Sequence, residues 1–523
     1  MQLDAIEPEI INYIKELESN YQHQIQELQT NIKEYQFKYL EIKERYDLLL
    51  FKRFGRSAEQ LLADEKQQRL FSEDEKNSSP GIITEKLFSE EIKSYQRKKP
   101  GRKPIDPKLR REDRIIDIPD SEKTCACGAK LTRIGEETSE KLIIIPPRIY
   151  VDRIIRPKYA CRNCEGTADE SKGAVHIADV EPSLIPRSIA SPSLLSTIIT
   201  QKYEDHLPYY RQEIQFERIG VRISRQDMSN WQQQIYGNLH PLFTLLKQTV
   251  KSGPVIQMDE TTVQVMGEPE RGDKQKSYMW LALGGEPGKT VVWYEYHETR
   301  AGMHAKEILE GYRGYLQTDG YEGYDAAVKD MPMIKHVGCF AHARRKFYEA
   351  AKVNKEARSA EEGIKHIRNL YSIENELRKQ DLDAQIFLSE RKARAGPVLE
   401  KFKAWLMKRR EEVPPTVLLG KAIHYSLAQW DKMTAYLESP YLTPDNNACE
   451  NAIRPFVLGR KNWLFNKSPL GAESSCGMFT LIQTAKQNGL IPFEYLMKLF
   501  DRAATASEPD DWEKLLPWNI FTG

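Results

Sequence analysis

The sequence predicts a multidomain chain of the α+β class, and three features of its 523 residues carry this prediction. Apolar residues recur every three or four positions between residues 10 and 49, as they do in a long amphipathic helix. Two close pairs of cysteines follow between residues 125 and 164. From residue 255 onward, runs rich in β-branched residues alternate with helical patterns. A chain of this length folds as several domains.

Composition and periodicity divide the chain into eight segments. They are a coiled-coil helix (1–62), a linker with a basic segment (63–114), a cysteine module (115–180), a helical region (181–250), the first part of a strand-rich domain (251–347), a helical insertion (348–440), the second part of that domain (441–470) and C-terminal helices (471–523). The sequence shows no signal peptide and no run of about 18 apolar residues, which predicts a cytoplasmic protein without a membrane partner.

The first predicted element is a helix whose apolar seam includes Ile14, Leu17, Tyr21, Ile25 and Leu28. Steps of three and four with one stutter are typical of a coiled coil, and therefore of a homodimer. The same pattern also fits a long amphipathic helix that packs on its own domain, because several seam positions are tyrosine.

A basic segment follows the polar linker. Residues 91–114 contain ten Lys/Arg and four Asp/Glu, a net charge of +6, whereas the whole chain has a net charge of +1. Lys99, Arg102 and Lys103 lie in a Gly-Arg-Lys-Pro stretch that is suited to a narrow minor groove of DNA. A solvated linker without a ligand has the same composition.

Four cysteines come next, namely Cys125, Cys127, Cys161 and Cys164. A hairpin over residues 141–160 would bring the two pairs together, and four thiolates at this spacing predict a structural Zn²⁺ site. The first pair is Cys-X-Cys, one residue shorter than the usual Cys-X-X-Cys knuckle. Beyond the module, residues 212–219 and 224–234 have the cadence of a helix-turn-helix, which an ordinary αα-hairpin shares.

The strand-rich domain shows five strand-like runs, at 255–265, 277–283, 290–296, 314–318 and 334–339. Three antiparallel strands, followed by two that are reached through helical crossovers, are the order of a ribonuclease-H-like domain. This order places Asp259 on the first strand and Asp319 just after the fourth.

Asp259, Asp319 and Glu450 are the candidate ligands of a two-metal site. Mg²⁺, or Mn²⁺ in its place, takes hard oxygen ligands and needs only a few carboxylates from the protein. Two such ions stabilise the entering and leaving oxygens of a phosphoryl transfer. Each residue also has a simpler interpretation: the aspartates as turn carboxylates, and Glu450 as part of a capping box with Asn447 as the N-cap.

Basic side chains near these carboxylates are candidate DNA contacts. They are Arg344 and Arg345, in a helix that also carries His342, and Arg454, Arg460 and Lys461, which follow Glu450. Solvated helix faces, or pairing of Arg454 with Glu450, account for them equally well. Pro455 is expected to kink or end the helix that contains it.

In this order the motifs resemble the DDE transposases of bacterial insertion sequences, in particular the insertion-sequence family numbered sixty-six. The resemblance rests on Phe54-Gly55-Arg56-Ser57, Pro100-Gly101-Arg102-Lys103-Pro104, Arg156-Pro157-Lys158-Tyr159-Ala160-Cys161, Leu207-Pro208-Tyr209-Tyr210-Arg211-Gln212, Thr318-Asp319-Gly320-Tyr321, His342-Ala343-Arg344-Arg345-Lys346-Phe347, Asp445-Asn446-Asn447 with Glu450, Arg454-Pro455 and Gly459-Arg460-Lys461-Asn462-Trp463-Leu464-Phe465. It implies a catalytic triad of Asp259, Asp319 and Glu450, a ribonuclease-H-like core with a helical insertion, and dependence on Mg²⁺.

The expected function is therefore that of a bacterial, nucleoid-associated transposase. It would bind the terminal inverted repeats of an element, cut a DNA strand and join the freed 3′-hydroxyl to target DNA, as a homodimer and with possible accessory proteins of the same element. Two alternatives stay open. One is a ribonuclease-H-like nuclease without strand transfer, and the other is a catalytically inactive DNA-binding protein derived from a transposase.

Overall fold

The computed structural model describes residues 8–54, 149–160, 175–353 and 358–521, and the chain divides into two compact units. The smaller unit spans residues 74–180, and its described part contains the antiparallel strands β1 (Lys158–Ala160) and β2 (Val175–Ile177). The predicted hairpin over 141–160 is wrong for residues 149–157, which are irregular. The strand that follows them, β1, pairs with β2, which lies after the second cysteine pair in the sequence. The four cysteines, Lys99, Arg102 and Lys103 lie outside the described residues.

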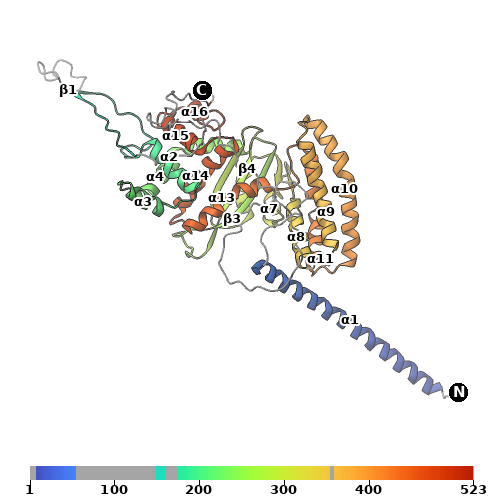
Figure 1. The fold of residues 1–523 in the computed structure, drawn as a ribbon. Coiled ribbons are helices and arrows are strands. Elements are labelled where there is room, and N and C mark those ends of the chain that lie inside the picture. The colour runs from blue at the N-terminus through green and yellow to red at the C-terminus, as the bar shows by residue number, and fades with distance from the viewer. Residues whose placement is uncertain (1–7, 55–148, 161–174, 354–357, 522–523) are drawn as a thin grey trace, which may run out of the picture. The chain divides into compact units, whose positions relative to one another are not determined.

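The larger unit comprises residues 1–73 and 181–523 and contains the other described elements (Figure 1). Before the sheet come α1 (Pro8–Phe54), α2 (Pro192–Tyr203), α3 (Tyr209–Arg218), α4 (Arg225–Asn238) and α5 (His240–Val250). The sheet segment contains β3 (Val255–Gln264), β4 (Lys276–Gly284), β5 (Val291–His297), α6 (Gly302–Ile308), β6 (Gly314–Gln317), α7 (Glu322–Val328) and β7 (Ile334–Val337). It is followed by α8 (Phe340–Val353), α9 (Arg358–Arg378), α10 (Ala384–Glu412), α11 (Leu418–Ala428), α12 (Trp430–Thr434), the 3₁₀ helix η4 (Ala435–Glu438), α13 (Asn447–Trp463), α14 (Pro469–Gln487), α15 (Pro492–Arg502) and α16 (Pro509–Lys514). None of the described helices is both long and apolar enough to span a membrane.

Helix α1 confirms the predicted N-terminal helix. The seam residues are solvent-exposed in the single chain, with Tyr21 62%, Ile25 54% and Leu28 60% exposed. Near the other end of the helix, Glu44 accepts a hydrogen bond from the Leu418 N–H (2.7 Å). The apolar stripe is therefore not covered by the helix's own domain over most of its length.

The five predicted strands of the larger domain are all present, and they form one sheet in the order β5-β4-β3-β6-β7. Strand β4 is antiparallel to both of its neighbours, β3 and β5, whereas β6 pairs parallel to β3 and β7 parallel to β6. Helices α6 and α7 provide the two crossovers, as parallel pairing requires. Strand β3 is therefore central, with a neighbour on each side.

Helices cover both faces of this sheet and one of its edges. Helices α6 and α7 lie against the face that carries Trp280, whose ring packs edge-on to Tyr324 (5.8 Å). On the opposite face, the hydroxyl of Tyr294 donates a hydrogen bond to a carbonyl of α13. Helix α14 covers the outer edge of β5, where Thr480 Oγ1 accepts the Tyr294 N–H (3.1 Å) and Thr484 Oγ1 the Val292 N–H (3.1 Å). These bonds block further strand addition at this edge.

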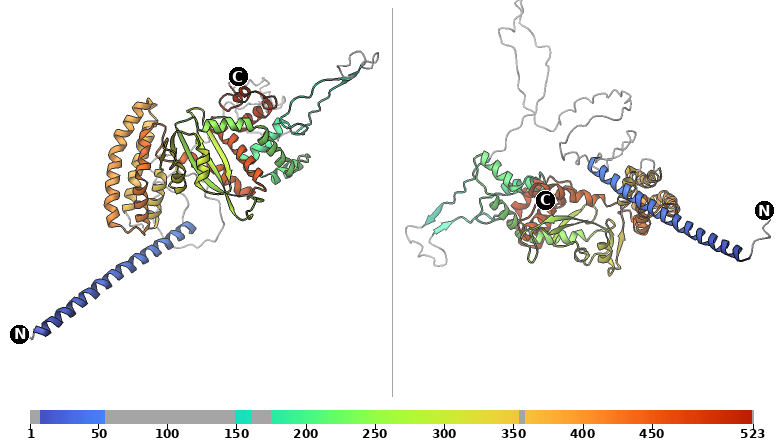
Figure 2. Two further views of the ribbon diagram at one scale, coloured as in Figure 1. Left: turned by 180° about the vertical axis from the view of Figure 1, so that it is seen from behind. Right: turned by 90° about the horizontal axis from the view of Figure 1, so that it is seen from below.

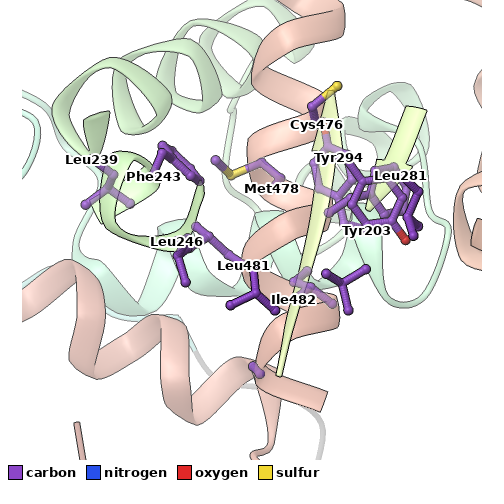
Figure 3. Packing of buried hydrophobic residues seen from close by; sticks show 14 of the residues in the cluster. Tyr203, Leu239, Phe243, Leu246, Leu281, Tyr294, Cys476, Met478, Leu481 and Ile482 are labelled. Atoms are coloured by element: carbon purple, nitrogen blue, oxygen red, sulfur yellow. The ribbon is translucent and has the colours of Figure 1, made fainter. Parts of the chain in front are cut away.

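The main hydrophobic core joins this sheet to the helices before and after it. Figure 3 shows Phe243 and Leu246 of α5 facing Met478 and Leu481 of α14, with Leu239 just before α5 on the far side of Phe243. The helix before the sheet and the last part of the chain therefore share one core. Helices α3 and α4 occupy the segment predicted as helix-turn-helix, with a turn at residues 219–224.

The predicted helical insertion consists of α9 to α12, which pack with α8 around a second hydrophobic core (Figure 2). Inside it, Arg391 of α10 is fully buried and donates to the carboxylate of Glu374 (2.7 Å). The same guanidinium donates to the carbonyls of Tyr436, Ser439 and Leu442 at 2.8–3.0 Å. The insertion thereby fixes the segment that leads into α13.

Replacement of Arg391 tests this connection. Arg391→Met keeps the volume but leaves buried Glu374 with only the half-exposed Arg378 as its cation, and it leaves three carbonyls without their donor. We therefore expect a loss of about 3–5 kcal/mol in the free energy of unfolding. The control is Arg394→Met on the same helix, which removes an exposed pair with Glu376 and should cost at most about 1 kcal/mol. Urea denaturation followed by circular dichroism measures both. Equal losses would contradict the role assigned to Arg391.

Candidate active site

Asp259 lies in the middle of β3, on the sheet face that α13 covers. Its register partner on β4 is Leu281, which pairs in turn with Tyr294. The side chain is partly buried, and its Oδ1 accepts a hydrogen bond from the Glu260 N–H (2.8 Å). A carboxylate among packed strands needs compensation for the water it has lost.

Asp319 lies in the turn after β6, two residues beyond the end of that strand. Since Gln317 is in parallel register with Gln257, the turn reaches the level of Asp259 on the neighbouring strand. The Tyr321 N–H donates to Asp319 Oδ1 (2.9 Å) and fixes the carboxylate. A Cβ on Gly320 would lie only 2.7 Å from the hydroxyl oxygen of Tyr425, so any larger residue would force Tyr425 of α11 to move away from the turn.

Glu450 lies in the first turn of α13, and the predicted capping box is wrong. The N-cap is Asn446 rather than Asn447, and its side chain makes no capping bond but donates to the Met258 carbonyl (3.1 Å). Glu450 is therefore not used for capping. One of its oxygens, Oε1, is buried without a hydrogen-bond partner, and the carboxylate lies 3.5 Å from Arg345 Nη2 and 3.7 Å from His342 Nδ1.

Two buried glutamines join these three elements. Gln257 donates to Gln317 Oε1 (2.9 Å) and accepts the backbone N–H of Cys449 (3.2 Å). Gln317 donates to the Thr443 carbonyl (2.6 Å), just before α13. The two amides thus bind β3, β6 and the start of α13 to one another, and each lies two residues from an aspartate of the site.

The pKa shifts in the site reflect burial and the charges of neighbouring carboxylates. Burial, together with the charges of Glu260, Glu450 and Asp319, raises the pKa of Asp259 to about 8. Burial also lowers the pKa of His342, which the charge of Glu450 partly opposes. Negative charge has accumulated in a site of low polarity, where a bound cation would relieve the repulsion.

A fourth carboxylate, Glu260, points to the other face of β3. Its Oε1 accepts the Arg300 Nε–H (2.6 Å), and its Oε2 accepts the hydroxyl of Tyr324. The Arg300 guanidinium lies over the ring of Tyr321 (3.8 Å), and Tyr321 in turn bonds to Asp319. A continuous set of contacts therefore runs from Glu260 behind the sheet to the turn of Asp319.

Two observations indicate that these residues are suited to bind a divalent cation. Glu450 Oε1 is an unpartnered buried oxygen, and the pKa of Asp259 is raised by burial and by neighbouring carboxylates. Among the described residues, two groups have ligand atoms that all lie within 4.8 Å of one another, and the predicted triad is not one of them. One of the two is Cys339, His342 and Glu450. Carboxylates that serve two ions about 3.5–4 Å apart need not be in mutual contact.

The predicted DNA-contacting cations have different environments. Arg345 is 46% exposed beside Glu450, and Lys461 is exposed on α13. Arg344 is buried, and Arg460 donates to Thr261 Oγ1 (2.9 Å), so both serve the interior of the fold. Arg454 is partly buried in α13.

The sequence predicts that Pro455 kinks or ends this helix. The prediction of an end is wrong, because α13 continues through Pro455 to Trp463.

Sequence reasoning missed the supporting residues Glu260, Arg300, Tyr324 and Gln317. The only signal for Glu260 in the sequence is that it is a second acidic residue in a run rich in β-branched residues. The only signal for Gln317 is that it is an amide two residues before Asp319. Arg300 and Tyr324 carry no signal of their own in the sequence, because their roles depend on contacts across the sheet.

The raised pKa of Asp259 predicts how stability depends on pH without divalent cations. The protonated carboxyl is favoured in the folded state, so its contribution is fully present below its ordinary pKa of 3.8 and is lost as pH rises through about 8. Asp259→Asn removes this titration. In EDTA, the melting temperature of the variant should rise relative to the wild type between about pH 5 and pH 8. A difference independent of pH would contradict the assignment.

Family models match several parts of this chain. Residues 122–165 match the zinc-finger binding domain of transposase IS66, and residues 480–518 match the IS66 C-terminal element. Residues 41–114 match a model described as transposase C of IS166 homeodomain. The zinc-finger match covers the four cysteines of the predicted module.

Relatives from Sinorhizobium fredii (strain NBRC 101917 / NGR234) align over most of the chain. The uncharacterized protein y4jD is 32% identical over 79% of this chain and 80% of its own length. The uncharacterized protein y4hP is 31% identical over 82% of this chain and 78% of its own length. Residues 187–474, more than half of the chain and including Asp259, Asp319 and Glu450, match the model of the transposase IS66 family. The chain thus belongs to the IS66 family of transposases.

Proposed function

We propose that this protein is a DDE transposase that cuts DNA at the ends of its element and transfers the freed 3′-hydroxyl to target DNA. In the first reaction, water attacks the scissile phosphodiester and the 3′-oxygen leaves as a hydroxyl. In the second, that hydroxyl attacks a phosphodiester of the target, and the target's own 3′-oxygen leaves. The observation that carries the proposal is that the charges of Glu450 and Asp319 contribute to the raised pKa of Asp259, although Glu450 lies 191 positions away in the sequence.

Asp259, Asp319 and Glu450 would hold the Mg²⁺ or Mn²⁺ ions. When bound, such ions supply charge stabilisation to the entering and leaving oxygens of the phosphoryl transfer. The protein's own groups position the carboxylates: Tyr321 fixes Asp319, the backbone of Glu260 fixes Asp259, and Arg345 contacts Glu450. The half-exposed guanidinium of Arg345 is suited to a phosphate of bound DNA.

The sheet supports a ribonuclease-H-like core for this chemistry. Its order, with three antiparallel strands and two parallel ones beside the first, is the arrangement that the sequence led us to expect. The central strand carries Asp259, and the neighbouring parallel strand ends at Asp319. We include in the proposal a structural Zn²⁺ on the four cysteines, a site of action at the bacterial nucleoid, and accessory proteins of the same element.

Loss of the carboxylates tests the proposed chemistry. Asp259→Asn or Glu450→Gln should abolish Mn²⁺-dependent cleavage of a duplex that contains an element end, because each removes a metal-binding oxygen while keeping the side-chain size. Binding of the same duplex, measured by gel shift, should persist. The matched control is Glu473→Gln on α14, where an exposed glutamate is replaced outside the site.

The products separate the three candidate functions. Cleavage followed by joining to target DNA supports a transposase, whereas cleavage without joining supports the nuclease alternative. Binding without cleavage by the wild-type protein would mean a catalytically inactive DNA-binding protein. Undiminished cleavage by both carboxylate variants would refute the assignment of the site.

A transposase must handle two element ends, which a dimer does naturally. We propose that the exposed seam of α1 forms a coiled coil with a second copy of the chain. Ile25→Lys combined with Leu28→Lys should convert a dimer into a monomer in analytical ultracentrifugation, because both residues are exposed parts of the seam. Gln26→Lys combined with Thr30→Lys, on the other side of the helix, should leave the dimer intact. A wild-type monomer would contradict the proposal.

A further inference from the structure

A second group of metal-type ligands lies on the sheet face opposite Asp259. His297 is the last residue of β5, and His304 and Glu307 lie in α6. One ligand atom from each of the three lies within 4.8 Å of the others. Alternation along β5 places His297 on the face opposite Tyr294, and Tyr294 contacts α13 on the side of the candidate active site. This group is therefore separate from the predicted triad.

Both histidines present a buried ring nitrogen without a hydrogen-bond partner. These atoms are His297 Nε2 and His304 Nδ1. A buried polar atom without a partner costs free energy, so two of them side by side point to a missing ligand. The other nitrogen of His304, Nε2, lies 2.8 Å from Thr299 Oγ1. A ring that donates there presents the Nδ1 lone pair outward, which is how protein contacts orient metal-binding histidines.

Two carboxylates lie next to these nitrogens. Glu307 Oε2 is 3.7 Å from His304 Nδ1, and Glu295 Oε1 is 3.2 Å from His297 Nε2 without hydrogen-bond geometry. The other oxygen of Glu295 is held by Lys247 Nζ (2.9 Å) and Trp293 Nε1 (2.7 Å). Glu295 is therefore fixed with one oxygen directed to the histidines.

We propose that His297, His304 and Glu307, with Glu295 beside them, bind one divalent transition-metal ion of the zinc class. Imidazole and carboxylate ligands suit Zn²⁺ better than Mg²⁺, which prefers oxygen alone. The two rings are stacked, with centroids 4.1 Å apart and planes inclined by 24°. A tetrahedral zinc ion places ligand nitrogens roughly 3.3 Å apart, which is within the limit of 4.8 Å that the ligand atoms of this group keep from one another.

The alternative is that the histidines are protonated and form ion pairs with the glutamates. The two rings are stacked, and two imidazolium rings in this arrangement would repel each other. A metal ion satisfies both nitrogens with neutral rings, which agrees with the stacking and with their unpartnered atoms.

The position of the group gives the metal a structural role. His297 and His304 flank the turn at residues 298–301, which connects β5 to α6. That turn carries Arg300, which pairs with Glu260 behind the candidate active site. A metal ion bound across the turn would link β5 to α6 and hold Arg300 in place.

Zinc content of the untagged full-length protein tests the proposal. After loading with ZnCl₂ and exhaustive dialysis, mass spectrometry should find one zinc ion fewer per chain in His297→Gln/His304→Gln than in the wild type. The same deficit should appear in a Cys161→Ser/Cys164→Ser background, which removes ligands of the predicted cysteine site. The control is His366→Gln, a partly buried histidine that stacks on Phe402 in the insertion (5.2 Å).

A milder variant guards against misfolding. The Glu307 side chain is 55% exposed, so Glu307→Gln should keep the fold while it raises the zinc dissociation constant by roughly tenfold or more, measured by competition with a chelator. In the Cys161→Ser/Cys164→Ser background, the cobalt that is lost on introducing His297→Gln/His304→Gln should account for visible bands without thiolate charge-transfer absorption. Unchanged zinc content in the double histidine variant, or unchanged affinity in Glu307→Gln, would overturn the proposal.

Discussion

The hydrogen bond between Gln257 and Gln317 is the contact on which the geometry of the candidate site depends. It joins two parallel strands at residues that each lie two positions before an aspartate, while the remaining amide groups bind Cys449 and Thr443 around the start of α13. Both side chains are buried, so an unmet amide would carry its full desolvation cost. The positions of Asp259, Asp319 and Glu450 are thereby coupled, although the last two are 131 positions apart in the sequence.

This arrangement concentrates negative charge, and the surrounding fold counteracts it locally. Arg300 and Tyr324 hold Glu260, so that the acid adjacent to Asp259 is paired on the far side of the sheet. Arg345 lies beside Glu450. Burial and the neighbouring carboxylates raise the pKa of Asp259 to about 8. A site assembled in this way is well suited to divalent cations.

The helical insertion also contributes to the site, although it supplies none of the predicted triad. Arg391 binds the carbonyls of the segment before α13, and Tyr425 of α11 contacts Gly320 next to Asp319. Both connections run from the second hydrophobic core toward the sheet. Removal of the insertion would therefore disturb the site even if the chain were rejoined without a gap.

The strands and helices that position the site were predictable, because β-branched runs and apolar periodicity are local signals. The strand at 255–265 and the helices after residue 348 are examples. Contacts across the sheet were not predictable, since the pairing of Glu260 with Arg300 follows from register and crossovers rather than from neighbouring residues. Local rules also failed at two points. Glu450 does not cap its helix. Pro455 does not end that helix, because packing of α13 against β3 outweighs the one hydrogen bond that proline cannot donate.

The central claim is that Asp259, Asp319 and Glu450 hold the same metal ions. Iron-directed cleavage of the chain measures this directly: Fe²⁺ replaces Mg²⁺, hydroxyl radicals cut the nearby backbone, and mass spectrometry maps the cuts. Cuts near all three residues, suppressed by excess Mg²⁺, are the predicted result. Cuts confined to the segment around His342 and Glu450, with none near Asp259 or Asp319, would contradict the claim.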